Sequence, residues 1–431
     1  MINLKDIFKN NLLLKITSLN TLVISIRLII SLVVQRILAA TVGEIGIAKI
    51  GQLRNLTLII TSTSSLGVFN GIVKYVAEFK DKNEKLKDLF STAFLFVFIG
   101  SLLTSIIVFF NASWICNKLF GDLHLIFLIK FLALLPCVIG VNRLFQGILN
   151  GLSEYKKYAK IDLLSYILSI ALLLTCLYYY NLEGVLFSII LAPLIQFFVI
   201  IYVFGSQLKQ YIKFKGYNLK LPFAKEILAF TLMSFVSTVL LNYIELDIRT
   251  MITNKISINE AGYWTAMNFI SKNYMTFSSS IFTLYVIPKF SRIYTGRLFK
   301  EEVLYIYKTL LPLFGIGMIL VYLLRNEIIA IIYPDFIGME PLFKWQLLGD
   351  FVRLTTLVIA HQFLAKKMVK TFVITELMSL AIFYILSKNL VVIYGTEGVV
   401  MAHFIRYISY FFIVVIAVWN YFRIQNIKED N

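Results

Sequence analysis

The chain has 431 residues, of which 59% are hydrophobic and only 15% are charged, and its mean hydropathy is +0.81. A soluble domain carries about 25% charged residues and has no core large enough for this much apolar surface, so the composition excludes an ordinary soluble protein. Backbone groups in lipid must be satisfied internally, which leaves helices or a closed barrel. The apolar runs are about 20 residues long and do not alternate with period two, so we expect an all-α integral membrane protein.

The charge is strongly basic, with 41 Lys and Arg against 24 Asp and Glu and a net charge of +17. The basic residues fall mostly in short loops between the apolar runs, where they act as topology signals, so we expect no nucleic-acid partner. With the N-terminus inside, the cytoplasmic segments hold 25 Lys and Arg and the outer segments hold 5. This bias predicts a multi-pass protein with both termini in the cytoplasm.

Twelve stretches are long and apolar enough to span a bilayer. They are residues 13–39, 45–72, 89–110, 125–147, 161–180, 185–206, 227–248, 263–287, 303–323, 345–364, 372–394 and 399–420. Two of the connections are very short, at 181–184 and 395–398. Each splits a run too long for one span, which predicts a helical hairpin.

The two halves of the chain contain a weak internal repeat. Residues 180–185, Tyr-Asn-Leu-Glu-Gly-Val, recur at 394–399 as Tyr-Gly-Thr-Glu-Gly-Val, an offset of 214. Two shorter matches have nearly the same offset: Glu44-Ile-Gly46 with Glu260-Ala-Gly262, and Lys74-Tyr75 with Lys289-Phe290. Six predicted spans separate the copies, so the two halves share one orientation in the membrane.

The repeat predicts two six-helix lobes joined by a basic segment. We expect the N-terminal lobe over 1–206, a cytoplasmic linker over 207–225 and the C-terminal lobe over 226–431. Two lobes with a cleft between them form the architecture of an alternating-access transporter.

Eleven Lys and Arg remain inside the predicted spans. A central Arg or Lys costs about 2.5–3.5 kcal/mol on insertion scales, whereas one near a span end snorkels to the headgroups. Five lie nearer the middle and Lys130 is intermediate, and all six are predicted to face a cavity: Arg27, Arg54, Lys130, Lys272, Arg353 and Arg406. Polar residues share helical faces with several of these cations. The shared faces are Trp264, Asn268, Lys272, Thr276 and Ser279; Gln346, Asp350 and Arg353; and His403, Arg406 and Tyr410. Interhelical hydrogen bonding without any substrate is the competing explanation.

Acidic residues within or near the spans are roughly half as many as the cations. They are Asp162, Glu245, Asp247, Asp350 and Glu376. Helical spacing allows Asp350 to pair with Arg353 and Glu245 to pair with Arg249. A positive surplus remains after such pairing, which favours an anionic substrate such as a phosphate.

Enzyme signatures are missing from the sequence, which has no Walker loop, no HExxH and no nucleophile elbow. The three histidines are scattered and do not have the spacing of a metal site. We therefore expect a transporter without a metal or a resident cofactor.

Several segments resemble one family in order and spacing across most of the chain. They are Gly67-Val-Phe-Asn-Gly-Ile-Val-Lys-Tyr-Val-Ala77, Phe230-Thr-Leu-Met233, Tyr285-Val-Ile-Pro-Lys-Phe-Ser-Arg292 and Trp345-Gln-Leu-Leu-Gly-Asp350. These segments are similar to the Wzx-type flippases of O-antigen and enterobacterial common antigen. That family belongs to the multidrug/oligosaccharidyl-lipid/polysaccharide (MOP) exporter superfamily, so the resemblance implies a MATE-like fold of twelve helices.

The resemblance implies movement of an undecaprenyl-pyrophosphate-linked sugar repeat unit from the cytoplasmic to the periplasmic leaflet of a bacterial inner membrane. It also implies a role in lipopolysaccharide biosynthesis, with an O-antigen polymerase and a chain-length regulator as partners. The family pattern carries over to Arg54, Lys130, Arg249 and Asp350, which the resemblance places in the cavity or its gate. We expect proton or sodium coupling, and the candidates for gating or ion coupling are Asp162, Arg249, Asp350 and Glu376.

Three alternatives remain open. The first is a MATE-like drug or metabolite exporter, although a pocket for cationic drugs favours acids over bases. The second is a membrane polymerase or ligase for lipid-linked sugars, which is disfavoured because no predicted outer loop exceeds about 20 residues. The third is a structural membrane subunit, in which interior charges have no use.

Overall fold

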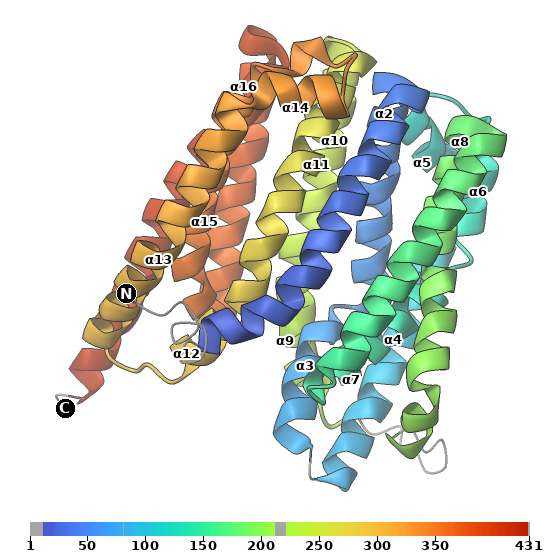
Figure 1. Ribbon diagram of the computed structural model, residues 1–431. Helices are drawn as coiled ribbons and strands as arrows, with labels where there is room; N and C mark the ends of the chain where they lie inside the picture. The colour runs from blue at the N-terminus through green and yellow to red at the C-terminus, as the bar shows by residue number, and fades with distance from the viewer. Residues whose placement is uncertain (1–11, 81, 212–220, 430–431) are drawn as a thin grey trace, which may run out of the picture. The chain divides into compact units, whose positions relative to one another are not determined.

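The computed structural model describes residues 12–80, 82–211 and 221–429. The N-terminal segment 1–11 and residues 212–220 of the predicted linker lie outside the described residues. Within the described ranges the chain forms helices joined by short turns, without a strand (Figure 1). The prediction of an all-α protein is therefore confirmed.

The helices form two compact units, which are described separately. Unit 1 comprises residues 1–48 and 251–431, and unit 2 comprises residues 49–250. Helices α2 (Leu12–Ser65) and α10 (Leu241–Lys255) cross the boundary between the units. The other elements of unit 2 are α3 (Val68–Phe79), α4 (Asn83–Phe110), α5 (Ala112–Phe120), α6 (Ile126–Leu132), α7 (Pro136–Gly151), α8 (Tyr155–Tyr211), α9 (Ala224–Ser234) and the π-helical η1 (Phe235–Leu240).

The other elements of unit 1 lie after α10 in the chain. They are α11 (Ile258–Ile281), the π-helical η2 (Phe282–Val286), α12 (Ile287–Ser291), α13 (Gly296–Leu323), α14 (Arg325–Ile332), the 3₁₀ turn η3 (Ile337–Met339), α15 (Leu342–Ala365) and α16 (Val369–Glu429). The contact-based units and the predicted lobes divide the chain differently, because the first part of α2 belongs to unit 1 and α9 belongs to unit 2. The lobes 1–206 and 226–431 were predicted from the sequence repeat and stay a prediction.

Seven of the described helices are long and apolar enough to cross a membrane, and the bent pair α6 and α7 makes eight if it forms one span. Three of the seven, α2, α8 and α16, contain 54, 57 and 61 residues. A straight helix rises about 1.5 Å per residue and needs about 20 residues to cross the hydrocarbon, so each of these three is long enough for more than one crossing. The count of twelve spans stays a prediction.

The chain reverses direction within α8 and within α16. Asn181 has φ 47° and ψ −133°, and Gly395 has φ 61° and ψ −145°, both outside the helical region. Residues eight apart in a straight helix are separated by about 12 Å. Yet a methyl group on Gly184 or on Gly398 would lie 2.1 or 2.2 Å from the carbonyl oxygen of the residue eight positions earlier. The two predicted hairpins are confirmed, and they share one geometry at the offset of 214 residues.

Each unit has its own apolar core. In unit 2, α3, α4 and α8 pack around α7, with Val68, Phe90 and Ile148 fully enclosed (Figure 1). In unit 1, α11, α13 and α16 pack against α15, with Leu354 and Phe363 fully enclosed. Because the other helices of unit 1 pack around α15, the polar face of α15 is buried together with its apolar residues.

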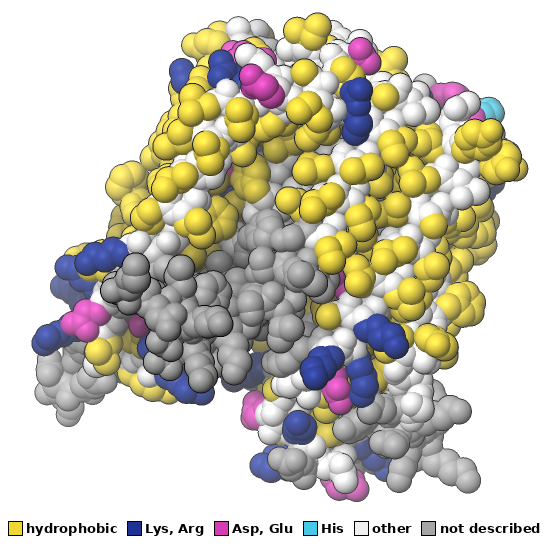
Figure 2. All heavy atoms as spheres, in the orientation of Figure 1, with side chains coloured by type: hydrophobic (Ala, Val, Ile, Leu, Met, Phe, Trp, Pro, Cys, Tyr) yellow, Lys and Arg dark blue, Asp and Glu magenta, His cyan; other side chains and the backbone are white. Residues whose placement is uncertain are grey.

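Large apolar side chains also cover the outside of each unit. Figure 2 shows hydrophobic side chains along the visible helices, whereas Lys, Arg, Asp and Glu gather towards helix ends. Phe98 in unit 2 is 61% exposed and Ile319 in unit 1 is 61% exposed. Apolar area of this extent is compatible with lipid as the solvent and not with water.

Candidate functional site

Asp350 is the centre of a buried polar cluster in unit 1. It lies on α15, and its side chain is fully enclosed. Its Oδ2 accepts hydrogen bonds from Ser271 Oγ at 2.5 Å, from Gln346 Nε2 at 3.1 Å and from the hydroxyl of Tyr274. Its Oδ1 lies 3.1 Å from Nε2 of His403. Hydrogen-bond donors from three helices therefore surround one carboxylate and stabilise its negative charge.

Helical spacing positions the groups of this cluster. Gln346, Asp350 and Arg353 share one face of α15, and Arg353 Nη1 lies 3.8 Å from Asp350 Oδ1. The predicted pairing of these two residues at i,i+3 is confirmed. Gly349 provides the space for His403 of α16, because a methyl group on Gly349 would lie 2.4 Å from the ring carbon Cδ2 of that histidine.

A second buried ion pair lies within the hairpin of α16. Arg406 is 3% exposed, its Nη2 lies 3.5 Å from Glu376 Oε1, and its Nε donates to Ser379 Oγ at 2.8 Å. The guanidinium lies 5.1 Å from the ring centre of Phe383 and 4.9 Å from that of Tyr407. The charge is thus neutralised by a carboxylate and enclosed by aromatic faces, which reduces its burial penalty.

Tyr407 connects the two ion pairs. Its ring centre lies 4.9 Å from the His403 ring and 5.7 Å from the guanidinium of Arg353, in addition to the contact with Arg406. We call Asp350, Arg353, Glu376, His403 and Arg406 the unit-1 charge cluster. Its two arginines balance its two carboxylates, so the net charge is zero with neutral His403 and +1 with protonated His403. Histidine is the side chain whose ordinary pKa lies nearest neutral pH, so His403 is the candidate titratable group of the cluster.

Metal binding is not indicated by this geometry. Among the residues that the structure describes, no group of three or more His, Cys, Asp and Glu side chains could hold a metal ion. The atoms facing Asp350 are mainly donors, whereas a hard cation needs a cage of oxygen acceptors.

The remaining predicted site residues of unit 1 lie outside these contacts. Arg27 on α2 is partly buried, and Lys272 on α11 is exposed. Thr276, which shares the predicted polar face of Lys272, is also exposed. The side chains of α11 that reach Asp350 are instead Ser271 and Tyr274, which are spaced i,i+3 on a neighbouring face. These two residues were not among the predicted site residues, although their i,i+3 spacing is a usable signal.

Unit 2 contains a separate polar group where α2 packs on α10. Arg249 is 2% exposed and lies one helical turn after Glu245 on α10, and the pairing of these two residues stays a prediction. Asn55 Nδ2 donates to Glu245 Oε2 at 3.1 Å and to the carbonyl oxygen of Asn242 at 3.2 Å. The side-chain amide of Asn55 on α2 thus bonds both a side chain and the backbone of α10, which fixes the two helices against each other.

The other predicted residues of unit 2 are more accessible. Arg54 on α2 and Asp162 on α8 are partly buried, and Lys130 on α6 is exposed. A pair that was not predicted joins α5 to α10, since Lys118 Nζ lies 3.0 Å from Asp247 Oδ1. The predicted sites thus comprise one connected cluster in unit 1, two further positions in unit 1, Arg27 and Lys272, and several positions in unit 2.

The sequence of this chain matches one protein family and two curated relatives. Residues 13–294 match the family described as polysaccharide biosynthesis protein. Two curated relatives, the lipid III flippases of Escherichia coli (strain K12) and of Shigella flexneri, are each 27% identical over 390 residues. The aligned region covers 88% of this chain and 92% of each relative.

Solved structures show the same fold. An inward-facing multidrug resistance MATE family transporter of the MOP superfamily has a TM-score of 0.74 and 14% identity, covering 92% of this chain and 94% of its own. The lipid II flippase MurJ, in an inward closed conformation, has a TM-score of 0.72 and 17% identity, covering 93% and 87%. The predicted MATE-like fold is therefore confirmed.

Proposed function

Because this chain belongs to the polysaccharide biosynthesis protein family, we propose that it is a membrane flippase for lipid-linked oligosaccharides and not an enzyme. The observation that carries this proposal is the alignment with the lipid III flippases, which extends over 88% of the chain. An alignment of this extent spans most of both units. The fold shared with MurJ, which is named as a lipid II flippase, supports the same class of cargo.

We propose further that the cargo is an undecaprenyl-pyrophosphate-linked repeat unit of O-antigen type and that the protein lies in the bacterial inner membrane with both termini in the cytoplasm. The excess of basic residues in the predicted cytoplasmic segments supports this orientation. The lobes 1–206 and 226–431 then alternate between inward and outward access. An O-antigen polymerase and a chain-length regulator are the proposed partners, because they act on the product of this step.

The cationic residues are proposed to neutralise the pyrophosphate. Arg27, Arg54, Lys130 and Lys272 are the candidates in this role. Arg353 and Arg406 contribute less net positive potential, since Asp350 and Glu376 lie 3.8 and 3.5 Å away and carry the opposite charge. For these two arginines, we propose that charge balance within unit 1 is the larger part of their role.

We propose that the unit-1 charge cluster couples transport to the proton gradient. Uptake of a proton by His403 changes the cluster from neutral to positive at a buried position, where water screens the charge poorly. The cluster joins α11, α15 and both arms of α16, so its charge can bias how these helices pack. Arg249 and Asp162 remain the candidates for gating in unit 2.

Complementation tests the proposed function. A strain that lacks its own lipid-linked oligosaccharide flippase is transformed with this chain, and the polysaccharide ladders are read on a gel. Restored ladders support the proposal, and a panel of host repeat units then defines the sugar specificity. Unrestored ladders across that panel, with confirmed membrane expression, contradict it; increased resistance to cationic drugs in the same strain then favours the MATE-like exporter alternative.

A further inference from the structure

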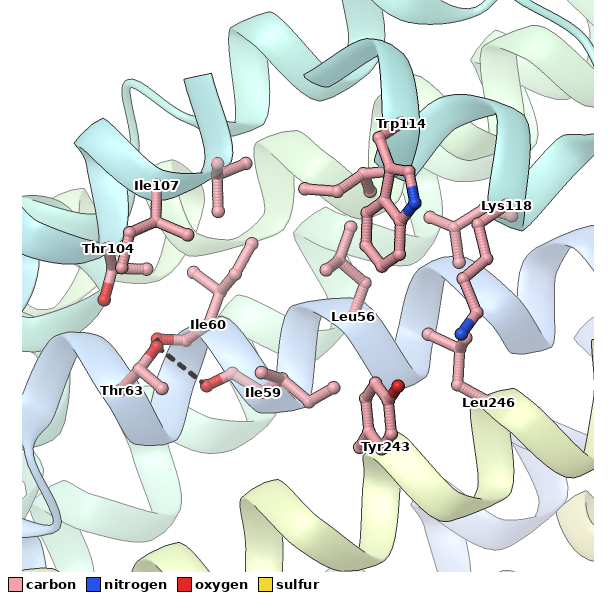
Figure 3. Close-up of a pocket in the computed structure, with 13 residues that line it drawn as sticks. Leu56, Ile59, Ile60, Thr63, Thr104, Ile107, Trp114, Lys118, Tyr243 and Leu246 are labelled. Carbon is pink, nitrogen blue, oxygen red and sulfur yellow. Dashed lines mark hydrogen bonds between the residues drawn. The ribbon is translucent and has the colours of Figure 1, made fainter. Parts of the chain in front are cut away.

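Unit 2 contains an apolar pocket to which the proposed function assigns no role. It has a volume of about 310 Å³ and lies where α2, α4, α5 and α10 meet (Figure 3). Leu56, Ile60, Val108 and Leu246 form its walls. On α2 the lining extends from Leu56 to Thr63, seven residues or about 10 Å of helix. The pocket is therefore elongated along a helix that crosses the membrane.

The deep end of the pocket offers little to a polar ligand. The hydroxyl of Thr63 donates to the carbonyl oxygens of Ile59 at 3.0 Å and Ile60 at 3.2 Å, within its own helix. With that hydroxyl satisfied, the adjacent walls are hydrocarbon. Water or sugar would have to give up hydrogen bonds to enter, whereas a hydrocarbon chain would gain dispersion contacts along the walls.

The other end of the pocket carries a lysine that is paired with an aspartate outside the lining. Lys118 lines this end together with Trp114 and Tyr243 (Figure 3). Its Nζ donates to Asp247 Oδ1 at 3.0 Å. The ammonium lies 5.4 Å from the ring centre of Trp114 and 5.1 Å from that of Tyr243. Burial lowers the pKa of Lys118, but the hydrogen bond and charge of Asp247 outweigh this effect, and the pKa is raised above its usual value.

This end of the pocket has the character of a membrane interface. Trp114 is 60% exposed and Tyr243 is 46% exposed. Exposed Trp and Tyr beside a Lys are typical of the headgroup level of a bilayer. The short helix α5, which carries Trp114 and Lys118, follows α4 directly, so it lies at the end of a candidate span.

We propose that this pocket binds one hydrocarbon chain of a zwitterionic phospholipid, whose phosphate faces Lys118 and whose ammonium faces Asp247. The apolar walls select a hydrocarbon chain, and the two charges select a headgroup that carries both signs. A headgroup with negative charge alone, such as a polyprenyl pyrophosphate, would meet repulsion from Asp247. The site is distinct from the unit-1 charge cluster and does not depend on the proposed transport function.

The test uses Trp114 as the reporter. Trp264, Trp345 and Trp419 are replaced by Phe in the full-length chain, and the protein is reconstituted in phosphatidylglycerol vesicles. A small fraction of the lipid carries brominated chains, which quench tryptophan fluorescence on contact. The brominated lipid is either phosphatidylethanolamine or phosphatidylglycerol. We expect several-fold more quenching by brominated phosphatidylethanolamine, and loss of this preference in Asp247→Asn, which removes the repulsion of the anionic headgroup.

A pocket-filling variant and a matched control separate this site from the lipid around the helix. Val108→Phe occupies the pocket and should remove the preference for phosphatidylethanolamine. Leu102 on α4 is 49% exposed and does not line the pocket. Leu102→Phe adds the same ring there, and the preference for phosphatidylethanolamine should be retained. Native mass spectrometry of the chain with all four tryptophans gives a second measurement. One phosphatidylethanolamine should remain bound to it after delipidation and be lost from Val108→Phe.

Two results would overturn the proposal. One is equal quenching by both headgroups in the chain with an intact pocket, together with no retained phospholipid in the mass spectrum. The other is displacement of brominated phosphatidylethanolamine by a smaller amount of polyprenyl phosphate than of unlabelled phosphatidylethanolamine, which would assign the pocket to an anionic carrier lipid. Either result leaves the flippase proposal standing, because complementation is measured independently.

Discussion

Nε2 of His403 on α16 lies 3.1 Å from Oδ1 of Asp350 on α15, within the interior of unit 1. The carboxylate already accepts hydrogen bonds from Ser271, Tyr274 and Gln346, so its negative charge is strongly stabilised. The imidazole is the one member of the unit-1 charge cluster whose ordinary pKa lies near neutral pH. This contact therefore joins the structural centre of the cluster to its titratable group.

Asp350→Asn should inactivate transport and lower stability. The amide keeps the shape of the side chain but removes the charge that balances Arg353 and organises the donors. Loss of one partner of a buried ion pair typically costs about 3–5 kcal/mol. The midpoint of thermal unfolding in detergent and complementation measure the two effects. Asp335→Asn, at an exposed position, is the control and should match the unsubstituted chain. Wild-type transport by Asp350→Asn would exclude a role for this carboxylate.

His403→Gln should abolish the pH dependence of transport without abolishing the fold. Glutamine can still donate to Asp350, but it cannot take up a proton. Protonation of His403 adds one positive charge to a neutral cluster, so transport by the unsubstituted chain should change as the pH falls through the pKa of this histidine. Initial rates in vesicles at fixed substrate measure this dependence. His124→Gln, on an exposed turn, should keep the variation. An unaltered pH profile in His403→Gln would rule out this histidine as the coupling site.

Some structural features could be predicted from the sequence and others could not. The hairpins at Asn181 and Gly395 were predictable because short polar connections interrupt apolar runs that exceed a bilayer crossing. The Asp350–Arg353 pair was predictable because i,i+3 spacing on one helix forces proximity. These features depend on residues close together in the chain, where helix geometry alone decides the contact.

The partners of Asp350 on α11 were not predictable in the same way. Polar residues occur on several faces of that helix, which is less apolar than the helices that could cross a membrane. Periodicity therefore supports more than one polar face, and the predicted face was that of Lys272 and not that of Ser271 and Tyr274. The pairing of Arg406 with Glu376 had the same difficulty, because it depends on how the two arms of α16 fold against each other.

A double-mutant cycle should show that Arg406 and Glu376 are coupled. Arg406→Gln or Glu376→Gln alone leaves one buried charge without its partner and should be strongly destabilising. The double variant removes both charges and should recover part of the loss, with a coupling energy of about 1–3 kcal/mol. The thermal unfolding midpoints of the unsubstituted chain, the two single variants and the double variant are measured in one detergent. The exposed pair Arg297 and Glu301 provides the matched cycle and should couple by less than about 1 kcal/mol. Additive effects at Arg406 and Glu376 would contradict the pairing.

Gly349→Ala should impair transport through the position of His403. The added methyl group would lie 2.4 Å from Cδ2 of that ring, which would have to move away from Asp350. Gly317→Ala on α13 is the matched control, because its methyl group has no atom within 4 Å. The control should be slightly more stable, by about 0.5–1 kcal/mol, since alanine favours the helix. Complementation and unfolding midpoints measure both variants, and equal activity of the two would show that the His403 position is not critical.

The central claim is that this chain moves lipid-linked oligosaccharides across a bilayer. The direct measurement uses purified protein in proteoliposomes that contain a polyprenyl-pyrophosphate-linked oligosaccharide, with a membrane-impermeant enzyme added outside to cleave the exposed sugars. Without protein, only the outer leaflet should be cleaved. With the intact chain, cleavage should proceed beyond that fraction when a proton gradient is applied, and Asp350→Asn should remain at the protein-free level. Cleavage by the intact chain that stops at the outer-leaflet fraction, under a gradient of either direction, would contradict the account.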